Sequence, residues 1–380
     1  MELINDDLLF SDSVIRMKKL DTPLNLLEIK KCMYKFNAES VYQTNVEISE
    51  WDGCTVMFKG KSFEAIENDW EYLKKIVNSV IAGRKEDKNH NKFQNQVYIT
   101  ENDRTYARPY DILSSKYVNQ YSNGRLYVTG HVAGLFEKLD KLILKFAESE
   151  KAIEFYSEPL WHEEELPKFG YTPNNDNLFQ INHFNDEKKL YWQNATCDNI
   201  WKSFENSVVD DFKVYSALGV CSRTEKNQVY FYERMNVFHM REIVAVGEKE
   251  QIIKFRERAI EFVIGLGQKL QLNFLLEQAG DPFFIEDNSK ANHDGDKYDL
   301  PEIIKIEYRP YLYDDKTLAC ASFNIHGDFF AKKFNYSGKT GKEPIWTSCI
   351  AFGLERWCWA ILVQFGTDFN KWPSFLKKLY

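Results

Sequence analysis

Two cysteines and one glutamate have the side-chain chemistry of a metal site. They are Cys197 in QNATCDNIW, Glu242 in FHMREIVAVG and Cys349 in TSCIAF. Two thiolates and one carboxylate would leave the fourth position of a tetrahedral zinc ion open, which is typical of catalytic sites. The separations of 45 residues (242 − 197) and 107 residues (349 − 242) carry no metal signal. Judged by residue type alone, buried cysteines and an ion-paired glutamate explain the pattern better.

Two arginines are candidates for binding an anion. Arg356 lies in WTSCIAFGLERWCWAIL (residues 346–362), where an apolar helical run begins. An arginine at the edge of a buried helix requires an anionic partner. Arg223 and Glu225 form an Arg-x-Glu triplet at the end of an apparent strand. Taken alone, such a triplet usually indicates a surface ion pair.

The segments around these arginines resemble the second and third signature motifs of class II aminoacyl-tRNA synthetases. Residues 221–242, CSRTEKNQVYFYERMNVFHMRE, resemble the second motif, and residues 346–362 resemble the third. Cys349 precedes Arg356 by seven residues (356 − 349), which is not general to that class. It narrows the resemblance to methanogen-type seryl-tRNA synthetases and the stand-alone amino acid:carrier protein ligases similar to them. The resemblance extends over residues 125–380.

That resemblance implies a catalytic zinc ion bound by Cys197, Glu242 and Cys349, because their order and local contexts match the family. In the family the zinc holds the amino group of the substrate. A Lewis acid selects the neutral amine and directs the carboxylate toward ATP.

The resemblance also implies roles in ATP binding. Arg223 would neutralise the α-phosphate, Glu225 would contact adenine, Phe238 would stack on adenine, and Arg356 would bind the far phosphates.

Further positions follow from the same resemblance. Asp281 in QAGDPFF and Asn324 in ASFNIHGDFF would position the substrate or ATP. Glu307 in KIEYRP would carry magnesium, and a solvated strand carboxylate is an equally good explanation. The segment IEFYSEPLWHEEELPKFGY, with Pro159, resembles the first motif, which implies a homodimer interface.

The function expected from these features is ATP-dependent activation of a small amino acid as aminoacyl-AMP. The aminoacyl group would then pass to the phosphopantetheine thiol of a separate carrier protein. One alternative is an aminoacyl-tRNA synthetase, and another is a synthetase paralogue without catalysis. We expect tRNA to be an unlikely partner because the chain is acidic and residues 1–124 contain no long basic stripe interleaved with aromatic residues.

Apolar periodicity predicts the elements that would position these residues. Helices are predicted at residues 63–80, 131–146, 248–270 and 350–364, and two strands around a turn at residues 229–247. Strands outnumber parallel-crossover patterns, so the expected fold class is α+β: an antiparallel sheet flanked by helices, with an additional N-terminal α/β region. The expected domains are residues 1–124, of unknown role, and the catalytic residues 125–380.

Composition sets broad limits. The 380 residues are 44% hydrophobic and 28% charged, with a formal net charge of −8. This is ordinary globular composition, and the surface as a whole is a poor match for nucleic acid. An odd number of cysteines, seven, suits reduced thiols. No apolar run spans a membrane and the acidic N-terminus lacks a signal-peptide core, so we expect a cytoplasmic location with no membrane partner.

Overall fold

The computed structural model describes most of the chain in two compact units. One unit comprises residues 1–94 with 278–282, and the other comprises residues 95–277 with 283–380. The larger unit therefore begins before residue 124, where the sequence-based boundary was placed. The described residues are 14–21, 24, 46–51, 54–60, 62–83, 98–100, 104–121, 125–171, 177–181, 189–224, 231–279, 305–313, 316–339 and 344–380.

The smaller unit is a three-stranded antiparallel sheet with one long helix. The strands β1 (Val14–Lys19), β3 (Thr55–Gly60) and β2 (Val46–Trp51) pair in that order, and α2 (Phe63–Gly83) follows them in the chain. Residues spaced three and four apart on α2 are buried, as its periodicity predicted. Trp70 packs edge-on against Phe58 with ring centroids 6.1 Å apart, so the helix and the sheet share one apolar core.

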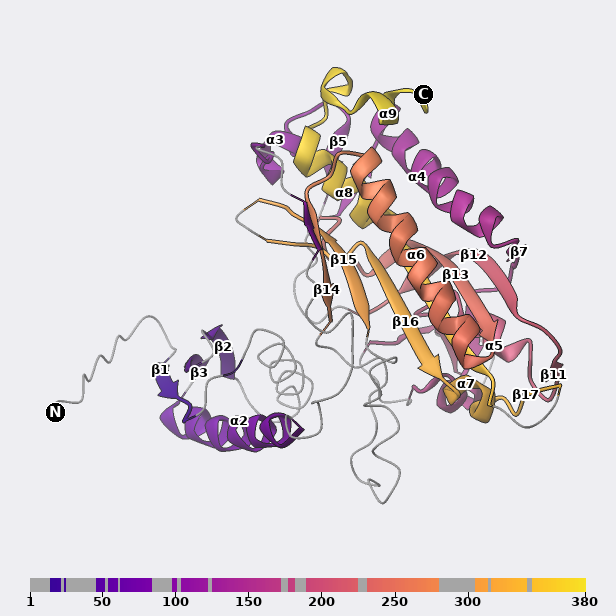
Figure 1. The fold of residues 1–380 in the computed structure, drawn as a ribbon. Helices are drawn as coiled ribbons and strands as arrows, with labels where there is room; N and C mark the ends of the chain where they lie inside the picture. Colours follow the sequence, from indigo (N-terminus) through magenta and orange to yellow (C-terminus); the bar gives the residue numbers. More distant parts are fainter. Residues whose placement is uncertain are drawn as a thin grey trace. The chain divides into compact units, whose positions relative to one another are not determined.

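The larger unit is built on an eight-stranded sheet, shown in Figure 1. The described pairings are antiparallel except for β12 with β7, which confirms the expected fold class. The strands in spatial order are β4 (Tyr98–Thr100), β14 (Phe274–Gln278), β15 (Ile306–Pro310), β16 (Ala321–Gly327), β18 (Trp346–Gly353), β13 (Val237–Gly247), β12 (Lys213–Ser222) and β7 (Ile153–Glu154).

One face of this sheet is covered by three helices: α4 (Gly130–Ser149), α6 (Lys249–Lys269) and α8 (Leu354–Phe365). Alternate residues of β13 point to this face, and Ile243 and Ala245 join its apolar core. Helix α6 runs along the sheet (Figure 1) and buries Phe255 and Ala259 against it. Helices α4 and α6 confirm the predictions made for residues 131–146 and 248–270.

The other face carries a second apolar core, which includes Val244 and Val246 of β13. Small elements cover it rather than long helices: β8 (Leu160–His162), η1 (Glu163–Phe169), β9 (Phe179–Ile181), β10 (Leu190–Trp192), α5 (Asp198–Lys202) and α7 (Phe329–Lys333). The remaining elements are α3 (Pro109–Leu113), β5 (Val118–Gln120), β6 (Leu126–Val128), β11 (Val208–Val209), β17 (Ser337–Gly338), η4 (Phe369–Lys371) and α9 (Ser374–Lys377).

Two predictions of secondary structure were wrong. The helix predicted from residue 350 begins at Leu354, because residues 346–353 form the inner strand β18. In the segment 229–247 only β13 is a strand, since Phe231–Glu233 form a turn and residues 229–230 lie outside the described part. The strand that pairs with β13 in the hairpin is β12. None of the described helices is long and apolar enough to cross a membrane.

Candidate functional site

The structure brings Cys197, Glu242 and Cys349 together on the second face of the sheet. Glu242 and Cys349 lie on the neighbouring strands β13 and β18, where Val244 is the direct partner of Cys349. Residues two apart on a strand share a face, so Glu242 and Cys349 are diagonal neighbours. Cys197 immediately precedes α5. The possible ligand atoms of the three residues all lie within 4.8 Å of one another.

These three side chains are almost completely buried and contact one another directly. Their exposed fractions are 1% for Cys197, 2% for Glu242 and 1% for Cys349. The Cys349 Sγ donates to Glu242 Oε1 at 3.0 Å, and the Cys197 backbone N–H donates to the other oxygen, Oε2. The glutamate thus joins the two cysteines into one cluster.

Burial dominates the electrostatics of this cluster. It raises the pKa of the Cys349 thiol to about 12 and the pKa of the Cys197 thiol well above its ordinary value. Burial also raises the pKa of Glu242, although hydrogen bonds from both cysteines oppose it. Three acidic groups packed this closely cannot all ionise without a compensating cation. Two sulfurs and a carboxylate oxygen are ligands that suit zinc, so the residues present fit the expected metal.

The segment that carries Cys197 is fastened to the edge of the sheet. Gln193 N donates to Pro159 O at 2.9 Å, and Ser222 N donates to Gln193 O at 3.0 Å. Trp192 Nε1 also donates to Val220 O at 2.8 Å. These bonds hold residues 192–197 against β12, which sets the position from which Cys197 approaches Glu242.

Strand β13 is anchored on its opposite face by the residue next to the cluster. Arg241 is 4% exposed and its Nε and Nη2 pair with both oxygens of Asp140 on α4 at 2.8 and 2.9 Å. Its Nη1 reaches Glu154 at 2.5 Å and Ser216 Oγ at 2.9 Å. The bidentate pair with Asp140, whose side chain is 15% exposed, holds Arg241 in a fixed geometry and thereby anchors the strand that presents Glu242.

Arg223 follows the end of β12, close to the cluster. Its guanidinium lies over the ring of Phe238, 5.2 Å from the centroid, and its Nη2 donates to Asn194 O at 3.4 Å. The positive charge of Arg223 lowers the pKa of the Glu242 carboxyl against the effect of burial. Phe238 is half-buried, whereas Glu225 lies outside the described residues.

Arg356 lies in the first turn of α8, where its Nη1 donates to Ala319 O at 3.0 Å. Burial lowers the pKa of its guanidinium, and the positive charges of Arg223 and Arg234 lower it further. Arg234 was not among the expected site residues, although it belongs to the same hairpin segment as Arg223. Arg356 therefore lies within electrostatic range of two other guanidinium groups, and such a concentration of positive charge suits a polyanion.

Asn324 lies directly beside the cluster, since it is the cross-strand partner of Cys349. Its Nδ2 donates to Ser322 Oγ at 3.1 Å and to Cys349 O at 3.3 Å, which leaves its buried Oδ1 without a partner among the described residues. Gln193 is similar: its Nε2 donates to Val220 O at 3.1 Å and its buried Oε1 has no described partner. Both oxygens are acceptors available to a ligand.

Glu307 is engaged in ion pairs. Its Oε1 lies 2.9 Å from Lys305 Nζ and its Oε2 lies 2.6 Å from Arg309 Nη1. Burial alone would raise the pKa of this carboxyl, but the two cations outweigh it and the pKa is lowered. A magnesium role for Glu307 stays a prediction. Asp281 lies outside the described residues.

Comparison with solved structures defines the class of the fold. The chain matches SerRS of M. kandleri, solved in complex with A. aeolicus tRNASec, with a TM-score of 0.66 over 97% of this chain and 77% of that chain. It matches the cytoplasmic serine-tRNA ligase of Naegleria fowleri in complex with AMP with a TM-score of 0.60 over 83% and 79%. Sequence identities are 17% and 12%. The fold is therefore that of a class II seryl-tRNA synthetase.

Sequence comparison gives the relatives. The chain is 29% identical over 191 residues to the type-2 serine–tRNA ligase of Methanocaldococcus jannaschii and 31% identical over 193 residues to that of Methanococcus aeolicus. Each match takes in 48% of this chain, and the chain spans only 36% of the length of these curated relatives. No family model matches. The chain is homologous to type-2 serine–tRNA ligases over about half of its length.

These relatives overturn the expectation that tRNA is an unlikely partner. Both curated relatives are tRNA ligases by name, and the M. kandleri protein was solved with a tRNA. The expectation relied on the net charge of −8, which is a sum over the whole molecule. Such a sum does not describe the local field of one surface.

Proposed function

We propose that this chain activates an amino acid with ATP, forming an aminoacyl adenylate and pyrophosphate. The observation that carries the proposal is the place of Arg223. Its charge acts both on Glu242 of the cysteine–glutamate cluster and on Arg356, so both groups lie within its electrostatic range. We assign the cysteine–glutamate cluster to the amine of the amino acid, Arg223 to the α-phosphate of ATP and Arg356 to the remaining phosphates.

The chemistry requires positioning more than proton transfer. The substrate carboxylate is already ionised, so its oxygen attacks the α-phosphorus without a general base. A new bond forms between a carboxylate oxygen and the α-phosphorus. At the same time the bond from the α-phosphorus to the bridging oxygen breaks, and pyrophosphate leaves with the electron pair of that bond as negative charge. Arg223 would neutralise the α-phosphate, and Arg356, with Arg234 nearby, would hold the departing phosphates. A zinc ion held by Cys197, Glu242 and Cys349 would supply a Lewis acid for the neutral amine.

The acceptor of the activated amino acid is a separate part of the proposal. The names of the relatives favour a tRNA as the acceptor. The resemblance to stand-alone ligases implies a phosphopantetheine thiol on a carrier protein, and no contact in the described residues favours it. Both acceptors attack the same aminoacyl adenylate, so the activation step is tested first.

The test is amino acid-dependent exchange of pyrophosphate into ATP, run with each of the twenty amino acids on protein whose zinc has been counted. We expect exchange with one or a few small amino acids at about one zinc per chain. Absence of both exchange and zinc would contradict the proposal. The amino acid that is found is then offered with total tRNA and with a phosphopantetheine-loaded carrier protein to identify the acceptor.

Cys349→Ser provides the matched variant. Replacing a thiolate ligand by a hydroxyl should abolish zinc retention and lower exchange by about 100-fold or more, while ATP still binds at the arginines. Cys54→Ser is the control, because Cys54 belongs to the smaller unit and is only half-buried. Equal zinc content in Cys349→Ser and in the unchanged protein would refute the assignment of the ligands.

A further inference from the structure

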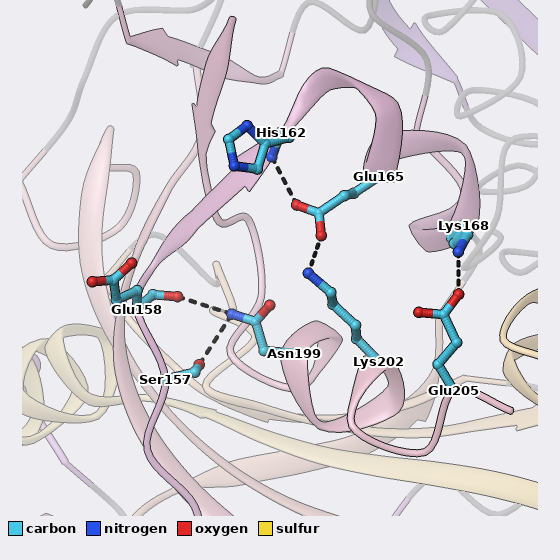
Figure 2. A network of polar contacts seen from close by, with 8 residues as sticks. All are labelled: Ser157, Glu158, His162, Glu165, Lys168, Asn199, Lys202 and Glu205. Atoms are coloured by element: carbon cyan, nitrogen blue, oxygen red, sulfur yellow. Dashed lines mark hydrogen bonds and ion pairs between the residues drawn. The ribbon is translucent and has the colours of Figure 1, made fainter. Parts of the chain in front are cut away.

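We propose that Asn199 is a positioning residue for the metal ligand Cys197. This inference rests on the proposed metal site. The hydrogen bonds of the Asn199 side chain go to Ser157 and Glu158 rather than to the ligands, so Asn199 would act through the short helix α5, which Cys197 immediately precedes. Figure 2 shows Asn199 within a network of polar contacts between α5 and the segment 157–168.

Helix α5 is too short to hold its own position. It contains only the five residues Asp198–Lys202, and Cys197 already has helical backbone angles (φ −71°, ψ −21°). An isolated turn of this length is unstable in water, so neighbouring groups must fix it. The orientation of α5 therefore sets both the Cys197 Sγ and the Cys197 N–H that reaches Glu242.

Apolar packing fixes one side of α5. Ile200 and Trp201 are 0% exposed. The Trp201 ring stacks on Phe330, with centroids 5.2 Å apart and planes 18° apart. The Trp201 ring also packs edge-on against His326, with centroids 5.7 Å apart. This packing holds one side of the helix, and contacts on another side would limit rotation about it. Asn199 is in place to provide them.

Asn199 connects the opposite side of α5 to the backbone segment 155–159. Its Nδ2 donates to Ser157 Oγ and to Glu158 O, both at 3.0 Å. The segment 155–159 is held at both ends by backbone hydrogen bonds: Phe155 N donates to Ser216 O of β12 at 2.7 Å, and Pro159 O accepts from Gln193 N at 2.9 Å. Asn199 thereby connects α5 to the same strand β12 that supports the Cys197 segment.

The neighbouring ion pairs are weaker candidates for this role. Lys202 pairs with Glu165, which also accepts from His162 N at 2.8 Å (Figure 2). The Lys202 side chain is 45% exposed, and ion pairs exposed to solvent contribute little to holding a structure in place. Asn199 is half-buried and uncharged, so salt does not screen its two hydrogen bonds.

The experiment measures zinc affinity by competition with a chromophoric chelator, which does not depend on catalysis. Asn199→Leu keeps a similar side-chain volume and removes both donors. We expect it to weaken zinc binding about tenfold, at the lower end of effects seen for groups that orient ligands. Lys168→Ala is the control, since it breaks the neighbouring pair with Glu205 (Figure 2), a residue that lies beyond the end of α5. It should leave zinc affinity within about twofold, as expected for a weak exposed pair.

Unchanged zinc affinity in Asn199→Leu would overturn the inference, and so would an equal loss in Lys168→Ala. If Asn199→Leu fails to fold, Ser157→Ala decides, because it removes one of the two acceptors. A smaller loss of zinc affinity in that variant supports the role, and no loss overturns it. Failure of the proposed metal site would look different, since the unchanged protein itself would then bind no zinc.

Discussion

At the scale of single residues, burial decides what the cysteine–glutamate cluster can do. Exposed cysteines and glutamate would find water, whereas these three groups face one another with exposed fractions of 1–2%. Desolvation penalises each negative charge, and proximity adds to that penalty. Without a cation the two thiols stay protonated, whereas a cation in contact with all three groups would let them ionise together. The cluster is therefore better suited to a metal ion than to acid–base chemistry near neutral pH.

His326 shows a different consequence of burial and gives a testable pH dependence. It is 0% exposed, its Nδ1 lies 3.0 Å from Thr347 Oγ1, and burial lowers its pKa to about 3. Its ordinary pKa of about 6.5 applies in the unfolded chain. Between these values the unfolded state binds the proton, so the stability present above pH 6.5 is lost as the pH falls. At pH 5 the loss amounts to about 2 kcal/mol.

His326→Gln removes the titrating group and keeps a polar side chain near Thr347. The fall in the free energy of unfolding between pH 7 and pH 5 should then be about 2 kcal/mol smaller than in the unchanged protein. Urea unfolding at both pH values measures this, with a chelator present in all samples so that loss of metal does not contribute. The same pH dependence in both proteins would show that His326 does not titrate differently on folding.

At the scale of elements, Gly219 allows the Cys197 segment to lie directly on β12. A Cβ atom at this position would meet Thr196 Oγ1 at 2.7 Å, Thr196 Cγ2 at 2.9 Å and Gln193 Nε2 at 2.8 Å. Thr196 is short and β-branched, so it has no freedom to move without its backbone. Gly219→Ala should therefore destabilise the protein by about 1–3 kcal/mol and weaken zinc binding, because the displaced backbone carries Cys197.

Gly265→Ala is the matched control for this substitution. Gly265 lies inside α6 and a Cβ there would meet nothing within 4 Å. Alanine in a helix interior should stabilise by up to about 1 kcal/mol and leave zinc affinity unchanged. Thermal unfolding and chelator competition on both variants separate the two effects. If Gly219→Ala is as stable as the unchanged protein and binds zinc equally, then the close contact between position 219 and the Cys197 segment does not position Cys197.

The sequence predicted long helices well and failed where both faces of an element are buried. Helices α2 and α6 each bury one face and expose the other, so their apolar residues recur at helical spacing and can be recognised in the sequence. Strand β18 lies inside the sheet with a core on each face, so WTSCIAFG has no alternation to distinguish it from the helix that follows. The three cluster residues come from a loop and two strands, and the fold alone makes them neighbours. Resemblance therefore identified them where spacing did not.

At the scale of the whole molecule, the match to solved structures includes the N-terminal part. The alignment with the M. kandleri protein takes in 97% of the chain, so only about 11 residues (3% of 380) lie outside it. The aligned part of the chain therefore extends into the smaller unit. The boundary between the units lies after residue 94, which is 30 residues (124 − 94) before the limit set by the extent of the sequence resemblance.

That boundary gives a prediction for two truncated chains, residues 95–380 and residues 125–380. The longer one keeps β4, which pairs with β14, and Arg104, whose guanidinium donates to Gln364 Oε1 at 2.8 Å and to Gln271 O at 2.9 Å. It also keeps Ile112 and Val118, which are 1% and 0% exposed in the core under α4 and α8.

The shorter chain should be the less stable of the two. Loss of the two buried side chains alone removes roughly 1.5–3 kcal/mol each. We therefore expect residues 95–380 to unfold cooperatively, and residues 125–380 to melt about 10 °C lower or to aggregate. Circular dichroism melts of both proteins at equal concentration measure the difference, and exchange of pyrophosphate into ATP by the longer chain reports whether its site is intact. Equal melting temperatures would instead place the start of the larger folded unit at residue 125, because residues 95–124 would then contribute nothing to its core.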